Sequence, residues 1–223
     1  VLLNMGLPMG FQYSITAIGS VILQASVNTL GSVAVAAMTA ASKISMFVVC
    51  PFDALGSTMA TYGGQNVGAG KLNRLSKGIW TAGMLGTIYS LVILGVLMLW
   101  GQYLVYLFVS ADEVVVIEQA RQFLIINAAF YIPLVYVNVV RFMIQGMGFS
   151  GFAVFAGVFE MAARTLVGAV FVPLFGFTAA CYASPLAWIF ADIFLIPAFY
   201  HCLHKLERQV KPQPAVAPPA AEA

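Results

Sequence analysis

Two opposite charges, Glu160 and Arg164, stand four residues apart in the run VFEMAARTLVGA, which is otherwise apolar. An ionised side chain near the middle of a membrane costs at least about 2.5–3.5 kcal/mol. Four residues apart on a helix, the two side chains lie on one face and can neutralise each other. Asp192 should lie at a similar depth, so we predict an intramembrane charge network of Glu160, Arg164 and Asp192, with Arg141 within reach.

This network has two interpretations. It is either a structural lock, because a partnered charge stays near its usual protonation state, or a gate or proton-linked site. Asp53 stands in another apolar run and has no local partner except Lys43. We therefore take Asp53 as the candidate for binding or exchanging a coupling cation.

The composition places these charges in a membrane protein. The 223 residues are 61% hydrophobic and 8% charged, whereas soluble domains carry about 25% charged residues. The net charge of +2 is small, and basic residues do not gather with aromatic ones, so we expect no nucleic-acid partner. The sequence offers no metal-ligand spacing and no catalytic set of side chains, so we expect neither an enzyme nor a cofactor.

Six segments are apolar and long enough to cross a bilayer, which takes about 20 residues. They predict an all-α membrane protein with a bundle of six transmembrane helices. Pro51, Pro133 and Pro185 lie inside these segments, and each should kink its helix. The predicted spans are Leu7–Leu30, Val33–Gln65, Ile79–Phe108, Val114–Gln145, Phe152–Phe175 and Ala179–Leu203.

The loops predict an orientation. Basic residues gather after the second and sixth spans, and acidic residues after the third, which puts the two basic clusters on one side of the membrane. By the positive-inside rule, that side, with the C-terminus, faces the cytoplasm, and the protein is expected in the cell membrane. We expect one six-helix domain over residues 1–208 and a disordered Pro/Ala-rich cytoplasmic tail over 209–223. The clusters are Lys71, Arg74 and Lys77; Lys205, Arg208 and Lys211; and Asp112 and Glu113.

Polar residues form stripes on three of the spans when each is drawn as a helix with 100° per residue. Such stripes predict a cavity that water can reach, which small molecules could enter. The alternative is that they join helices through interhelical hydrogen bonds. The stripes contain Tyr13, Thr16, Ser20, Gln24 and Asn28; Lys43, Cys50, Asp53 and Ser57; and Asn127, Tyr131, Asn138, Arg141 and Gln145.

Several short motifs, taken in order, resemble the C-terminal lobe of the multidrug and toxic compound extrusion (MATE) transporters. The resemblance covers about residues 4 to 205. Each motif is weak alone, and their order and spacing carry the likeness. They are Gly6-Leu7-Pro8, Gln65 with Gly68-Ala69, Arg141 with Gln145-Gly146 and Gly148, Glu160 with Arg164, Gly176, and Pro185 with Trp188.

The resemblance implies an antiporter of twelve helices in two six-helix lobes, which lie in the bilayer around a central cavity. Such a transporter exports cationic or aromatic drugs in exchange for Na⁺ or H⁺. In the family, the first, second and fourth helices of this lobe line the cavity, and these helices carry the three stripes. Many members have an acidic residue on the first or fourth helix. Here the fourth has only Glu118 near its end, so coupling would fall to Asp53 or to the N-terminal lobe.

The sequence leaves other functions open. One is a flippase for lipid-linked oligosaccharides, whose cavity would be more basic; another is a membrane scaffold that transports nothing. Because the chain opens at Val1 and offers only six spans, we expect either a fragment whose N-terminal lobe is missing or a half-transporter that pairs with a second copy.

Overall fold

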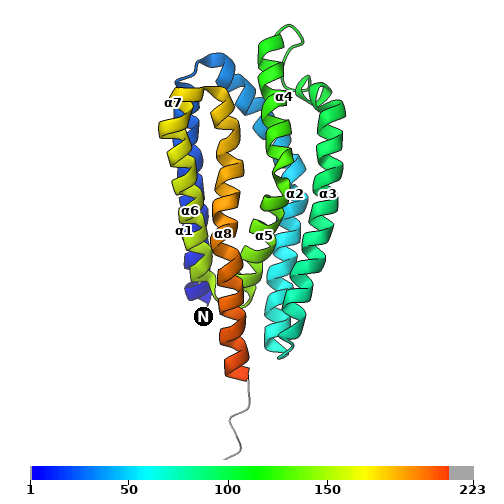
Figure 1. Cartoon of the computed structure of the whole chain (residues 1–223), viewed down its shortest axis with the longest axis vertical. Coiled ribbons are helices and arrows are strands. Elements are labelled where there is room, and N and C mark those ends of the chain that lie inside the picture. The colour runs from blue at the N-terminus through cyan, green and yellow to red at the C-terminus, as the bar shows by residue number, and fades with distance from the viewer. Residues whose placement is uncertain (1, 211–223) are drawn as a thin grey trace, which may run out of the picture.

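The computed structural model describes residues 2–210 of the chain, with side chains for 6–209. Within those bounds the chain is helical, with short connections and no strand (Figure 1). The predicted tail over 209–223 lies almost wholly outside the described residues. The elements are α1 Leu2–Asn28, α2 Ser32–Gly68, α3 Asn73–Val105, α4 Val114–Ala129, α5 Tyr131–Gly146, α6 Ser150–Leu166, the π-helical η1 Val167–Phe171, α7 Val172–Phe175 and α8 Phe177–Val210.

Six membrane-spanning units follow from these helices. Five continuous helical stretches are long and apolar enough to span a membrane. One of them, Ser150–Phe175, is made of α6, η1 and α7 together. The remaining unit is the pair α4 and α5, whose axes are bent by 54°. This confirms the predicted all-α bundle of six spans, with the fourth span built from two helices.

The break between α4 and α5 falls at Phe130, whose backbone angles of φ −107° and ψ 17° are not helical. Pro133 explains the position. It lacks the amide that would bond to the Ala129 carbonyl, and its ring crowds that carbonyl, so the helix is disrupted up to four residues before the proline. By contrast, α2 and α8 run without interruption through Pro51 and Pro185.

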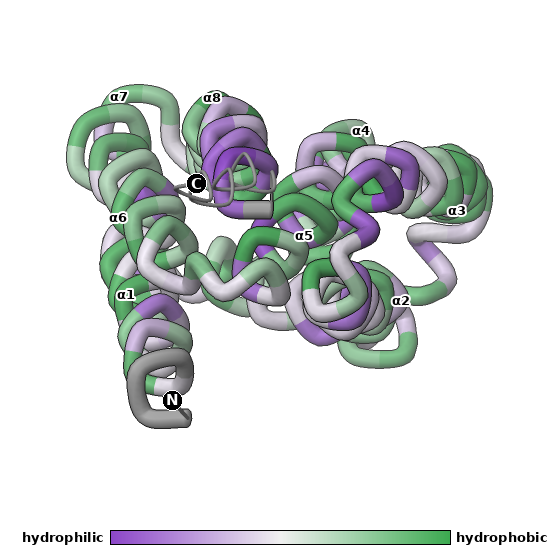
Figure 2. Tube along the Cα trace, turned by 90° about the horizontal axis from the view of Figure 1, so that it is seen from below, coloured by the Kyte–Doolittle hydropathy of each residue, from purple (hydrophilic) through white to green (hydrophobic). Residues whose placement is uncertain are grey.

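The helices pack in two groups around α5 and α8. One group is α1 against α6, and the other is α2, α3 and α4. α5 and α8 contact each other and link both groups, α5 through α2, α3 and α6, and α8 through α4 and α6. Figure 2, which looks along the bundle, shows α5 in the middle, with α1 and α2 on opposite sides of it. α5 is therefore the element that the rest of the lobe encloses, and most of its residues are buried.

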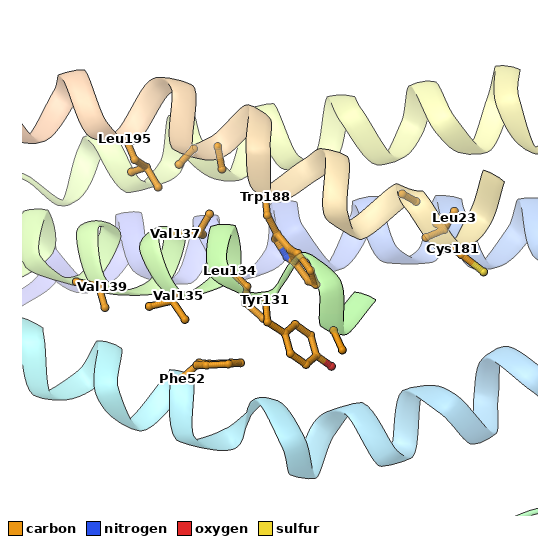
Figure 3. Close-up of a cluster of buried hydrophobic side chains, with 14 of the residues drawn as sticks. Leu23, Phe52, Tyr131, Leu134, Val135, Val137, Val139, Cys181, Trp188 and Leu195 are labelled. Carbon is orange, nitrogen blue, oxygen red and sulfur yellow. The ribbon is translucent and has the colours of Figure 1, made fainter. Parts of the chain in front are cut away.

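Aromatic side chains fill the bundle at the level of the α4–α5 break. The ring of Tyr131, the first residue of α5, packs against the rings of Phe52 on α2 and Trp188 on α8. The distances between ring centroids are 5.5 Å and 6.1 Å. Figure 3 shows the three rings together, with Leu134 beside them. The Phe52–Tyr131 contact is edge-to-face and the Tyr131–Trp188 contact is tilted, and aromatic contacts of this kind add to the stabilisation that burial gives. The cluster fixes the start of α5 between α2 and α8.

Close backbone contact joins α5 to its neighbours. A Cβ atom at Gly146 would overlap the carbonyl of Ala60 on α2, and one at Gly86 of α3 would overlap the side chain of Val135. Small residues at such points let helices in a membrane approach each other closely. These contacts hold α5 in place along most of its length.

Candidate functional site

The polar stripe on the fourth span points into the lobe. Its five residues, from Asn127 to Gln145, are all buried because α5 and the end of α4 are enclosed by α2, α3, α6 and α8. Buried polar groups need partners. Asn127 donates to the carbonyls of Phe123 and Cys181, which ties α4 to α8.

Arg141 is the charged member of this stripe, and its partner is Glu160 on α6. The Nη2 atom of Arg141 donates to Oε1 of Glu160. Nη2 of Arg164 lies 3.5 Å from the other carboxylate oxygen, Oε2. All three side chains are buried. The structure therefore brings together one carboxylate and two guanidinium groups, with the i, i+4 pair on α6 joined by an arginine from α5.

α1 is joined to the same cluster by hydrogen bonds. Gln145 on α5 donates from Nε2 to Oε1 of Gln12 at 2.6 Å, and Nη1 of Arg164 donates to the carbonyl of Thr16 at 3.4 Å. Gly19 lets α1 approach α6 closely, because a Cβ there would lie 3.0 Å from the Cα atom of Met161.

The sequence pattern did not predict a role for Gln12. It placed the neighbouring Tyr13 in the polar stripe instead, and that side chain is 58% exposed. The signal that could have found Gln12 is its spacing to Gly19, Leu23 and Val27, which share its helix face and are buried. That apolar face, rather than the stripe with more polar residues, is the one that packs on α6.

Asp192 lies on α8 near the cluster but outside its ion pairs. It is partly buried and lies within Coulombic range of Arg141. Its Oδ1 atom is buried and has no hydrogen-bond partner among the described residues. The same holds for Thr16 Oγ1 and for Nε of Arg141, so several polar atoms in this region lack a partner.

The predicted stripes on α1 and α2 face outward. Tyr13, Ser20 and Asn28 are exposed on α1, while Thr16 and Gln24 are partly buried. Gln24 donates to Asn28 at 3.0 Å within the same helix. On α1 the outward-facing members of the stripe are therefore Tyr13, Ser20 and Asn28.

On α2, both charged members of the stripe are exposed, and they do not pair with each other. The ammonium of Lys43 lies over the ring of Phe108 at 5.8 Å, a cation–π distance. Asp53 is exposed and forms no ion pair with any residue in the part of the chain that the structure describes.

The arrangement gathers one carboxylate and two guanidinium groups in a buried ion-pair network. Within residues 6–209, no three His, Cys, Asp or Glu side chains lie together as a metal site would require. What the lobe presents is one buried charge cluster and two exposed polar faces on either side of α5.

Comparisons with known proteins identify related chains. A family model described as MatE matches residues 8–171. A curated relative, the probable multidrug resistance protein YpnP of Bacillus subtilis strain 168, is 29% identical over 141 residues, which are 63% of this chain and 31% of that protein.

Solved structures share the fold. One described as MATE in the bent conformation superposes with a TM-score of 0.84 at 18% identity, over 94% of this chain and 46% of its own. A transporter of the MOP superfamily from Pyrococcus furiosus gives a TM-score of 0.78 at 18% identity, over 95% of this chain and 48% of its own. The chain thus spans about half the length of the solved structures that it matches.

Proposed function

Since this chain belongs to the MATE family of membrane transporters, we propose that it is the C-terminal lobe of a secondary exporter of cationic or aromatic drugs, driven by Na⁺ or H⁺. The observation that carries the proposal is the pair of exposed polar faces on α1 and α2. They lie on either side of the buried central helix α5 (Figure 2). Polar groups on a membrane helix are costly toward lipid and are tolerated where they line a water-filled cavity.

In this proposal the drug and the cation meet the lobe at different groups. Tyr13 on α1 offers an exposed aromatic ring to a cationic drug. Asp53 on α2 is the candidate for the coupling cation, because it is an exposed carboxylate without an ion-pair partner among the described residues. The second lobe, expected in the same polypeptide, would close the cavity from the opposite side.

The flippase alternative needs free cations to bind a pyrophosphate. Arg141 and Arg164 are both buried and both contact Glu160. Lys43 is then the one cation of the three that faces outward. This distribution supports export of cationic drugs over binding of a polyanionic headgroup.

We further propose that the transporter lies in the cell membrane with its basic loops in the cytoplasm. The connection between α2 and α3, which carries Lys71, lies at the same end of the bundle as the end of α8 (Figure 1). Because the two basic clusters lie at one end of the bundle, the positive-inside rule supports assigning both to the cytoplasmic side. Labelling of single cysteines at these two sites in intact cells and in broken cells would test the orientation.

Transport by the complete protein in proteoliposomes tests the function. We expect ethidium efflux to follow an imposed Na⁺ or H⁺ gradient, and Asp53→Asn to reduce the gradient-driven rate by about tenfold or more. Asn138→Ala, on the buried face of α5, should lower efflux by altering how α5 packs between the two exposed polar faces. The matched control is Thr81→Ala on α3, whose hydroxyl bonds only to its own helix, at the Lys77 carbonyl. Unchanged efflux in stably inserted Asp53 and Asn138 variants would favour the scaffold interpretation.

A further inference from the structure

The two carboxylates at the junction of α5, α6 and α8 differ in how many ion-pair partners they have. Glu160 contacts both guanidinium groups, that of Arg141 and that of Arg164. Asp192 forms no ion pair with any described residue, although it lies within Coulombic range of Arg141. Two cations therefore contact one carboxylate, while the second carboxylate in the region has no partner.

A buried carboxylate without a partner is costly when it is ionised, and a bound proton removes most of that cost. Oδ1 of Asp192 is buried and accepts no hydrogen bond from a described residue. Arg141 has a donor to spare, since its Nε is also buried without a partner. The two unsatisfied atoms belong to opposite charges, so contact between the two side chains would satisfy both.

The titratable and charged groups around the Asp192–Arg141 region come from the helices packed on α8. α5 supplies Arg141, and α6 supplies Glu160 and Arg164. α1 supplies Tyr13 within Coulombic range of Arg141. η1 and α7 have no titratable residue, and the charges of α4 lie in its first half, where Arg121 donates to Met98 on α3.

We propose that Arg141 exchanges between Glu160 and Asp192, and that Asp192 holds a proton while Arg141 is bound to Glu160. When Arg141 turns to Asp192, the Asp192 proton passes to water and the carboxylate pairs with the guanidinium. Glu160 keeps Arg164 as its partner throughout. Each exchange thus releases or takes up one proton on α8.

The consequence for transport rests on the proposed function. Arg141 links α5 to α6 in the structure, and after the exchange it would link α5 to α8. Proton binding at Asp192 would then decide which pair of helices is joined, which gives proton uptake a means to move the cavity wall. This role is separate from that of Asp53, which faces outward on α2.

Infrared difference spectroscopy of the complete protein tests the protonation directly. At neutral pH we expect the C=O stretch of a protonated carboxyl group, and we expect Asp192→Asn to remove it. Glu207→Gln is the matched control, because it removes an exposed carboxylate near the end of α8 and should leave the band in place. A band that persists in Asp192→Asn, or that is absent from the unaltered protein, would overturn the proposal. If Asp192→Asn does not fold, Asp192→Glu replaces it and should shift the same band.

Proteoliposomes measure the consequence. Proton-driven ethidium efflux should fall by about tenfold or more in Asp192→Asn, and efflux at the unaltered rate would contradict the exchange. The infrared result also separates the two hypotheses. If the band depends on Asp192 but the unaltered protein exports no drug, the protonation of Asp192 stands and the proposed drug export fails.

Discussion

At the scale of single residues, the buried carboxylate of Glu160 is the ion-pair partner of two arginines. The pair with Arg141 and the contact with Arg164 hold two guanidinium groups that are almost wholly buried. A buried ion pair adds little net stability, because desolvation offsets the attraction. Removing one of the two partners is costly, since the remaining charge stays buried without a partner.

Glu160→Gln should therefore lower the free energy of unfolding by about 3–5 kcal/mol. Thermal unfolding of the purified protein in detergent measures the loss. The control is Glu207→Gln, which alters the same side-chain type at an exposed position near the end of α8. Equal melting temperatures for the two variants would show that the buried cluster is not what stabilises this junction.

The spacing of Glu160 and Arg164 was enough to predict their contact, because four residues on one helix fix the geometry. The contact between Gln12 and Gln145 was not predictable in this way. It depends on which face α1 turns toward α6 and η1, and the close contacts on that face are at Gly19 and Gly168 rather than in the polar pattern.

At the scale of elements, six spans were predictable because long apolar runs report directly on bilayer thickness. The break at Phe130 was harder to place. Pro133 predicted a kink at its own position, but the proline acts on the turn before it, and the helix ends at Ala129. Apolar side chains continue through the break, so hydropathy does not mark it.

Close packing of α5 on α2 gives a prediction at this scale. Gly146→Ala should lower the free energy of unfolding by about 1–3 kcal/mol, since the added Cβ would overlap the Ala60 carbonyl and force the helices apart. Gly151→Ala is the matched control, because a Cβ at that position on α6 meets nothing within 4 Å. Chemical denaturation of both variants compares the two sites, and a larger loss in Gly151→Ala would argue against this packing.

At the scale of the whole molecule, the lobe exposes polar groups that a bilayer does not accommodate well. Ser20 and Asn28 on α1, and Lys43 and Asp53 on α2, are exposed within the described chain. The likeness to solved structures covers about half of each of them. We infer that these faces need a second lobe, or a second copy, to cover them.

Residues 1–223 expressed alone should therefore aggregate or self-associate in detergent, while the complete protein should be monodisperse. Size-exclusion chromatography with light scattering measures the difference. Crosslinking between Tyr13→Cys positions would identify pairing of two copies through α1. A monodisperse monomer that unfolds cooperatively would contradict the need for a covering lobe.

The attachment of α1 has a consequence for biogenesis. Its hydrogen-bond partners lie 133 residues away at Gln145 and 148 residues away at Arg164. During synthesis α1 leaves the ribosome long before α6 exists, so it must wait in the insertion machinery or the lipid with Gln12 unsatisfied. Contacts so distant in sequence form slowly. The α1–α6 pair can therefore form only after α6 has been made, and only the contacts of η1, α7 and α8 need residues that are made later.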